Sequence, residues 1–206
     1  MLQIALPNKG ALSDGAVQLA SYAGYHCKRR GRELSVRDHH NVEFVFLRPR
    51  DIATYVSNGV LDLGVTGLDL LHDSGADVKH VMDLGFGEAR FCYAVPKESD
   101  LTPDAFTADT RIATSYTNLV RKDLDRRGVD ADIIDLDGAV EISIDLGVAD
   151  AIADVVQTGR TIDEAGLETA GPPILDTQAI LVAQNGDVAQ IESARLFAER
   201  VRGILV

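Results

Sequence analysis

The stretch Ala149–Ile162, ADAIADVVQTGRTI, carries the pattern that decides the fold. Its first half is a run of small and branched apolar residues ending at Asp154-Val155-Val156, which is typical of a buried strand. A short polar turn, Gln157–Thr161, follows and leads into a helix-like stretch. A buried strand that passes through a tight turn into a helix indicates an α/β protein.

The same strand–turn–helix pattern recurs on both sides of this stretch. Apolar runs that we interpret as strands alternate with helical stretches, and the clearest are Gln3–Leu6, Val42–Leu47, Asp62–Val65, Arg90–Val95 and Ile180–Ala183. This alternation predicts an α/β fold with largely parallel strands. A final helix is predicted over Val188–Val206, with an apolar stripe that packs on the first part of the chain.

A short internal sequence repeat predicts two similar lobes. Gly59–Gly67 resembles Gly147–Ala153, because each segment has a glycine turn, an aspartate and then a buried strand, and a Thr-Gly pair follows each strand. The alternative is that any helix-to-strand turn favours Gly-x-x-Asp. The polar stretch Pro96–Pro103 and a return near Pro172–Thr177 then place one lobe over residues 1–95 plus 178–206 and the other over 96–177.

Composition narrows the class of protein. The chain has 206 residues, is 46% hydrophobic and carries a net charge of −12, so it is neither disordered nor a general binder of nucleic acid or anionic membrane. No apolar run is long enough to span a bilayer, and the N-terminus does not read as a secretory signal, so we expect a cytoplasmic protein. Cys27 and Cys92 lie far apart, outside any CxxC, and are expected to be core residues.

The turn at residues 154–161 is the first candidate site. A strand end before a helix N-terminus presents backbone N–H groups and the positive end of a helix dipole, which together favour a phosphate. Gly159 lets the backbone approach a ligand, Thr158 and Thr161 add hydroxyl donors, and Arg160 adds charge or points to solvent. Asp154 is placed to bind ribose hydroxyls or to hold Mg²⁺ through water. The alternative is a capped helix without a ligand.

Four further residues stand at strand–helix junctions, where open α/β sheets bind ligands. Lys9 follows the first strand, Arg48 follows the second, Asp69 opens a helix and Glu141 opens another. Each also has a structural interpretation, as a solvated turn lysine, a helix cap or a partner of the helix dipole. Arg48 and Arg50 stand two residues apart, so only one of the two is expected to face a ligand.

A histidine pair gives a weaker signal. His39 and His40 follow Asp38 in a polar loop, which permits a metal site but favours a solvated loop. No spacing typical of a zinc site supports the metal. We therefore assign no metal ligand from the sequence.

The segment from Glu141 to Ile162, E-x5-G-x-A-x2-I-x-D-V-x2-T-G-x-T-I, resembles the signature of the ATP phosphoribosyltransferase family. The PNKG turn, the LRPRDI run, the TGLD turn and the SYTNLV segment agree with that family in order and spacing, at Pro7–Gly10, Leu47–Ile52, Thr66–Asp69 and Ser115–Val120. The resemblance covers essentially the whole chain. Two departures are Ala11, where many members have Arg, and Ile162, where Leu or Met is usual.

The resemblance implies a fold, a reaction and a set of site residues. The fold is the two-lobed type II periplasmic-binding-protein-like fold, with a ligand cleft between the lobes. The reaction transfers the phosphoribosyl group of 5-phosphoribosyl 1-diphosphate (PRPP) to N1 of ATP with release of diphosphate, with Mg²⁺, as the first step of histidine biosynthesis. Asp154 to Thr161, including Val155, would hold the phosphoribosyl group. Lys9 and Arg48 would neutralise phosphate charge, and Asp69 and Glu141 would bind substrate.

The resemblance also implies partners. Some members carry a C-terminal histidine-binding domain, and others use a separate regulatory subunit that resembles a histidyl-tRNA synthetase. Because this sequence stops at Val206, we expect either a short form or a long form without that domain. We expect self-association or binding of a regulatory subunit, and no inhibition of this chain alone by histidine. The alternative function is a non-catalytic solute-binding module on the same fold.

Overall fold

The computed structural model describes residues 1–185 and 192–205, and the described residues form two compact α/β units. The first unit comprises Met1–Gly87 and Gln178–Val206, and the second comprises Glu88–Thr177. The second boundary lies where the sequence predicts it. The first boundary lies at Gly87 rather than residue 95, because the strand that contains Arg90–Val95 pairs within the second sheet.

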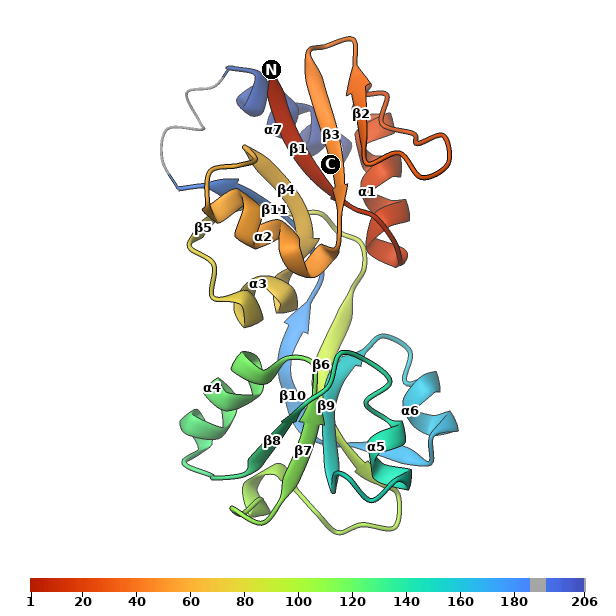
Figure 1. Cartoon of the computed structure of the whole chain (residues 1–206), viewed down its shortest axis with the longest axis vertical. Helices are drawn as coiled ribbons and strands as arrows, with labels where there is room; N and C mark the ends of the chain where they lie inside the picture. The colour runs from red at the N-terminus through yellow and green to blue at the C-terminus, as the bar shows by residue number, and fades with distance from the viewer. Residues whose placement is uncertain (186–191, 206) are drawn as a thin grey trace. The chain divides into compact units, whose positions relative to one another are not determined.

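The first unit is built on a mixed six-stranded sheet with the order β2-β3-β1-β4-β11-β5 (Figure 1). Its elements are β1 (Leu2–Pro7), α1 (Ala11–Tyr22), β2 (Ser35–Asp38), β3 (Val42–Leu47), α2 (Pro49–Ser57), β4 (Leu63–Gly67), α3 (Leu68–Ser74), β5 (Val78–Asp83), β11 (Ala179–Gln184) and α7 (Glu192–Ile204). The predicted final helix is confirmed over Glu192–Ile204, and residues 188–191 and 206 of that prediction lie outside the described part of the chain.

Both faces of the first sheet are covered by helices. Ile4 and Leu6 of β1 point to the face that α1 and α7 cover, where Phe197 and Val201 of α7 are buried. Ala5, between them in the sequence, points to the other face and packs with Ile52 of α2. This alternation explains why β1 is almost entirely apolar, because a strand buried on both faces has no solvent-facing side.

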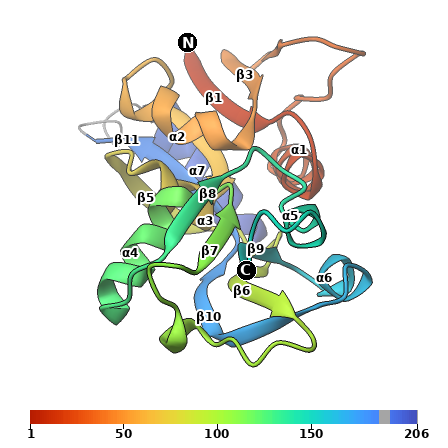
Figure 2. The same ribbon diagram turned by 60° about the horizontal axis from the view of Figure 1, so that its bottom comes forward.

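The second unit is built on a five-stranded sheet with the order β10-β6-β9-β7-β8. Its elements are β6 (Ala89–Pro96), the short 3₁₀ helix η1 (Pro103–Ala105), β7 (Arg111–Thr114), α4 (Thr117–Arg127), β8 (Asp132–Asp135), α5 (Ile142–Asp145), β9 (Ala151–Val156), α6 (Arg160–Glu164) and β10 (Leu167–Thr177). Figures 1 and 2 show α4 on one side of this sheet and α5 and α6 on the other.

The prediction of largely parallel strands is wrong. Parallel pairs join β1 to β3 and β4, and β7 to β8 and β9, but the remaining pairs among the described strands are antiparallel. For the two pairs of β11, the reason is the way the chain returns to the first unit. Ala179 begins β11 opposite Gly67, the last residue of β4, so β11 enters at the carboxyl edge of the sheet and runs against β4.

The two repeated segments, Gly59–Gly67 and Gly147–Ala153, occupy equivalent places in the two units. Asp62 precedes β4, accepts a hydrogen bond from Gln3 N–H at 2.8 Å and donates its own N–H to the Gln3 carbonyl at 3.1 Å. Asp150 precedes β9 and makes the same two bonds with Arg111, at 2.9 Å each. In each unit the aspartate therefore ties its strand to the start of the neighbouring parallel strand.

Candidate functional site

Three strand–helix junctions meet at the carboxyl edge of the first sheet. Strand β1 lies between β3 and β4, parallel to both, and Pro7 at its end pairs with Leu47 at the end of β3. Lys9 follows β1, Arg48 follows β3 and Asp69 follows β4. The structure thus brings these three predicted site residues to one edge of one sheet.

The turn after β1 is held by backbone contacts. Asn8 donates its N–H to the Leu47 carbonyl at 2.8 Å, which fixes the turn to the neighbouring strand. Gly10 has φ of +78° and is the N-cap of α1, a conformation that side chains rarely adopt. Lys9 stands between these two fixed residues with its side chain exposed.

Arg29 is a candidate site residue that the sequence did not indicate. Its Nη2 donates to the Asn8 carbonyl at 2.8 Å, and its guanidinium lies 4.4 Å from the centre of the Phe46 ring. These contacts bring a third cation to the carboxyl edge, beside the turn that carries Lys9. The one available signal was the basic run Lys28–Arg32, which belongs to a loop without periodicity.

The structure separates the roles of the two arginines after β3. Arg50 Nη1 lies 3.1 Å from Asp73 Oδ2, so this side chain links α2 to α3. Arg48 is the N-cap of α2 and is exposed, and its side chain makes no hydrogen bond or ion pair with any residue that the structure describes. Among the described contacts, Arg50 therefore has a structural partner and the Arg48 side chain has none.

The junction after β4 holds a buried carboxylate. Asp69 is in the first turn of α3 and its residue is 6% exposed. The hydroxyl of Thr66 donates to the Pro49 carbonyl at 2.9 Å, which ties the end of β4 to the start of α2. Asp69 is thus placed by buried structure rather than by a solvated loop.

The second unit has an equivalent carboxyl edge. Strand β7 lies between β8 and β9, parallel to both, and Thr114 Oγ1 at its end donates to the Ala153 carbonyl at 2.7 Å. Glu141 follows β8, and Asp154 lies near the end of β9. The predicted phosphoribosyl residues therefore lie on one edge of the second sheet.

The turn after β9 has the backbone geometry of the predicted site. Asp154 Oδ1 accepts the Val155 N–H at 2.7 Å, and Gly159 has φ of +78° as the N-cap of α6. Thr158 Oγ1 accepts the Arg160 N–H at 3.4 Å. Thr161, in the first turn of α6, is exposed. The exposed Thr158 and Thr161 thus place two hydroxyls at a turn that contains a left-handed glycine.

Two details of this turn differ from the sequence-based picture. Helix α6 has five residues, so its dipole is smaller than the predicted helix would supply. The Arg160 side chain lies 2.7 Å from Glu164 in an exposed ion pair, one turn along the same helix. The Arg160 guanidinium thus has a partner on its own helix.

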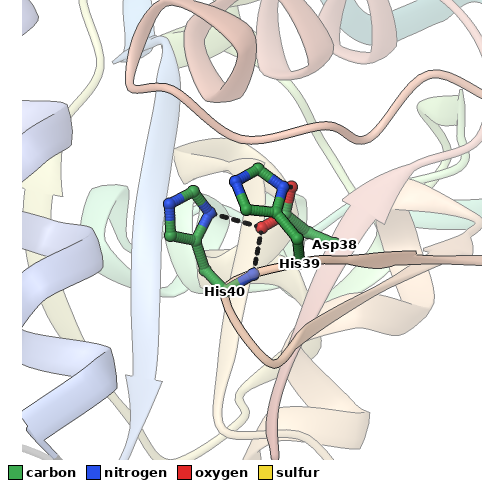
Figure 3. Close-up of side chains that lie close together, drawn as sticks. All are labelled: Asp38, His39 and His40. Carbon is green, nitrogen blue, oxygen red and sulfur yellow. Dashed lines mark hydrogen bonds and ion pairs between the residues drawn. The ribbon is translucent and has the colours of Figure 1, made fainter.

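Asp38, His39 and His40 form the one His/Cys/Asp/Glu group in the described part of the chain that has the spacing of metal ligands (Figure 3). The buried Asp38 carboxylate accepts N–H groups of His26 and His40 at 2.7 Å each, and it lies 2.6 Å from His40 Nδ1. His39 Nδ1 lies 3.3 Å from the same carboxylate. These contacts make Asp38 a structural link that holds the backbone at His26 and His40.

Both cysteines are core residues, as predicted. Cys27 and Cys92 are 0% and 3% exposed. Burial raises the pKa of Cys27 to about 11 and also raises the pKa of Cys92. A raised pKa disfavours the thiolate, which is the form that a cysteine nucleophile needs.

Solved structures with this fold include binding proteins and a transferase. The chain matches the arginine-bound form of ArgBP from T. maritima at 14% identity with a TM-score of 0.61, over 98% of this chain and 95% of that one. It matches an ATP phosphoribosyl transferase (HisG:HisZ) complex from Thermotoga maritima at 25% identity with a TM-score of 0.85, over 99% and 97%. The predicted fold class, an α/β protein of the type II periplasmic-binding-protein kind, is confirmed.

Within that class the sequence identifies the family. The ATP phosphoribosyltransferase family model matches residues 48–203. The chain is 77% identical to the ATP phosphoribosyltransferase of Salinibacter ruber and 54% identical to that of Corynebacterium diphtheriae, over its whole length and 73% of each relative. This chain belongs to the ATP phosphoribosyltransferase family, and it is an ATP phosphoribosyltransferase of histidine biosynthesis. Non-catalytic solute-binding proteins, the alternative function considered above, have only the fold in common with this chain.

No helix among residues 1–185 and 192–205 has the length and apolar character needed to cross a bilayer.

Proposed function

We propose that the carboxyl edges of the two sheets bind different parts of the substrates of this transferase. The turn of the second unit, Asp154 to Thr161, binds the ribose 5-phosphate of PRPP, and Glu141 binds substrate at the same edge. The edge of the first unit, with Lys9, Arg48 and Asp69, binds the nucleotide and diphosphate groups. The observation that carries the proposal is the left-handed Gly159 in the short turn that follows β9, five residues after Asp154, because a glycine there lets a phosphate approach the backbone.

In the proposed reaction, the lone pair of adenine N1 attacks the anomeric carbon of PRPP. The bond from that carbon to the diphosphate oxygen breaks, and diphosphate leaves with the electron pair. No enzyme nucleophile is needed, so the chain contributes binding, orientation and charge. Arg48 and Lys9 stabilise the negative charge that develops on the leaving group.

Asp69 has a different role in this proposal. A buried carboxylate accepts hydrogen bonds, so it binds the ribose hydroxyls or the adenine amino group of ATP rather than a phosphate. This assignment fits its place at the same sheet edge as Lys9 and Arg48, because the nucleotide carries both phosphates and hydroxyl or amino groups.

Mg²⁺ fits the oxygen-rich residues at the second edge. The Asp154 carboxylate and the hydroxyls of Thr158 and Thr161 are the hard oxygen donors that Mg²⁺ prefers. The ion would enter with PRPP, with Asp154 as its protein contact, directly or through water. Its chemistry is to neutralise diphosphate charge.

The proposal includes partners and a location. The Thermotoga maritima structure is of a HisG:HisZ complex. We infer that this chain likewise self-associates or binds a regulatory subunit resembling a histidyl-tRNA synthetase, that the 206-residue chain alone is not inhibited by histidine, and that it acts in the cytoplasm. Light scattering and activity at rising histidine test the first two points, and strong inhibition at micromolar histidine contradicts the second.

The deciding experiment mixes the protein with ATP, PRPP and Mg²⁺ and follows the formation of the N1-substituted adenine by its absorbance.

A second experiment tests the PRPP site by calorimetric titration of PRPP into the variants Asp154→Ala and Gly159→Val. Both variants should bind PRPP at least tenfold more weakly while retaining their circular dichroism spectra. Gly128→Val, at a left-handed helix cap elsewhere in the same unit, is the matched control for backbone strain. Unchanged PRPP affinity in both site variants would overturn the assignment.

A further inference from the structure

A cavity of about 190 Å³ lies in the first unit, between α7 and the sheet, away from the carboxyl edge. Its lining includes Lys79 and Val81 of β5, Ala183 of β11 and the face of α7 from Ala194 to Arg202. None of these residues belongs to the substrate-binding groups proposed above.

The cavity exists because small side chains face one another across it. Ala183 on the sheet and Ala194 and Ala198 on the helix all line it, and larger residues at these positions would fill the space. Leu63 and Val81 complete an apolar interior that is continuous with the core under α1 and α7. The interior therefore favours an apolar group.

The rim of the cavity is cationic. Lys79, Arg195 and Arg202 lie there with a single acid, Glu199, which Arg195 pairs at 2.8 Å. The side chains of Lys79 and Arg202 make no hydrogen bond or ion pair with any described residue. Lys79 and Arg202 therefore give the rim a local positive charge, which favours an anion there although the chain as a whole carries a net charge of −12.

We propose that this cavity binds a small carboxylate that carries an aromatic or branched aliphatic group. The apolar group occupies the space between the three alanines, and the carboxylate meets Lys79 and Arg202 at the rim. An apolar cavity of about 150 Å³ is known to take up benzene, so a cavity of this size accepts a six-membered ring with a short side chain. The site is distinct from the ATP and PRPP sites, and it does not depend on their assignment.

The test uses phenylacetate as the probe, with phenylacetamide as an uncharged molecule of the same shape and 2-phenylethylamine as a cation. Protein labelled with ¹³C at alanine methyl groups reports binding at Ala183, Ala194 and Ala198 directly, with Ala5 and Ala149 as internal controls. Phenylacetate should shift the three cavity methyls and bind at least tenfold more tightly than phenylacetamide. The cation should not bind there.

Three variants separate the contribution of the rim charges to phenylacetate binding from that of the apolar interior. Arg202→Gln and Lys79→Gln should each weaken phenylacetate binding about fivefold to tenfold and reduce the preference over phenylacetamide. Ala198→Leu should fill the cavity and abolish binding of both. Arg121→Gln, which removes an exposed arginine from α4, is the matched control and should leave binding unchanged. Thermal melting of each variant confirms that it is folded.

Two results would overturn the proposal. The first is equal binding of phenylacetate and phenylacetamide, or binding that survives both charge substitutions, since either would show that the rim does not select an anion. The second is a wild-type oligomer that Ala198→Leu converts to a smaller species by light scattering, because the occupant would then be a second protein chain.

Discussion

Asp69 Oδ1 lies so close to Gly67 that a Cβ on residue 67 would clash with it. Gly67 itself has φ of −86° and ψ of 146°, an extended conformation that any residue adopts. The requirement for glycine here is therefore one of space for the carboxylate, and not of backbone conformation.

Gly67→Ala should consequently displace Asp69 without unfolding the chain. A misplacement of about 1 Å in a positioning group can cost about 10² in rate, so we expect kcat/KM for ATP to fall by about 10- to 100-fold. The measurement is steady-state kinetics with ATP varied, alongside thermal melting. Gly203→Ala, where an added Cβ meets nothing within 4 Å, should leave both unchanged. Full activity in Gly67→Ala would remove Asp69 from nucleotide binding.

Arg48 and Arg50 should respond differently to substitution by alanine. Loss of one well-placed cation at a developing oxyanion costs about 10²–10³ in kcat, so Arg48→Ala should show that loss with little change in stability. Arg50→Ala removes the contact with Asp73 and should lower the free energy of unfolding by up to about 1 kcal/mol, with a smaller effect on kcat.

Kinetics and urea denaturation of both arginine variants test this division. If Arg48→Ala is fully active, the cation at this edge is Lys9 or Arg29 instead. Arg48→Lys should restore only part of the rate where the contact to phosphate is bidentate.

At the turn after β9, the backbone should matter more than the arginine. Gly159→Ala places a Cβ on a residue with φ of +78°, a conformation that costs about 1–2 kcal/mol for a residue with a side chain. The free turn relaxes to relieve this cost and has to regain the strained conformation to bind PRPP, so we expect about a tenfold loss of PRPP affinity. Arg160→Ala keeps the backbone N–H and breaks only the exposed pair with Glu164, so we expect at most about a threefold loss. Calorimetry with PRPP distinguishes the two, and a larger effect at Arg160 would reverse this ranking.

Asp38 should stabilise the fold in a pH-dependent way. Burial acts to raise its pKa, but hydrogen bonds from the backbone N–H groups of His26 and His40 and from the His40 ring outweigh burial, and the pKa lies below its usual value. A carboxyl with a lowered pKa contributes stability above its unfolded pKa of about 3.9, and this is lost as the pH falls through the folded value.

Asp38→Asn should therefore lower the free energy of unfolding at pH 7 by about 1–3 kcal/mol. The difference between variant and wild type should shrink below about pH 4. Urea denaturation at pH 7 and pH 3 measures it. His39→Ala is the control, because this ring is 74% exposed and should contribute little. A constant difference at both pH values would show that the Asp38 charge is not what stabilises the loop.

Two strands could not be predicted from the sequence, and each has a physical reason. Strand β10 contains Pro172 and Pro173, which argue against a strand in a sheet interior. The structure accommodates them because β10 is an edge strand, with an irregularity in its pairing to β6 between Ala170 and Leu175. Strand β2 is a short edge strand with two of its four residues exposed, it pairs with β3 alone among the described strands, and its residues carry no apolar alternation.

The candidate site was predictable to the extent that it follows strands. Lys9, Arg48 and Asp69 stand directly after apolar runs, so their positions at a carboxyl edge could be read from the sequence. Arg29 was missed because it is 21 residues from Asn8 along the chain and reaches that turn from a loop. The choice between Arg48 and Arg50 likewise required the position of Asp73 on another helix.

The sequence alone determined the features that depend on neighbours along the chain. The strand Val42–Leu47, the proline that begins α2 and the glycine turn at residue 159 follow from local periodicity and backbone preference, and the signature from Glu141 to Ile162 identified the family. Only the tertiary structure decided the strand order, the antiparallel entry of β11, the edge placement of β10 and the partners of Arg29 and Arg50. These features depend on contacts between residues far apart in the sequence, and local pattern does not encode which of the possible partners packs against which.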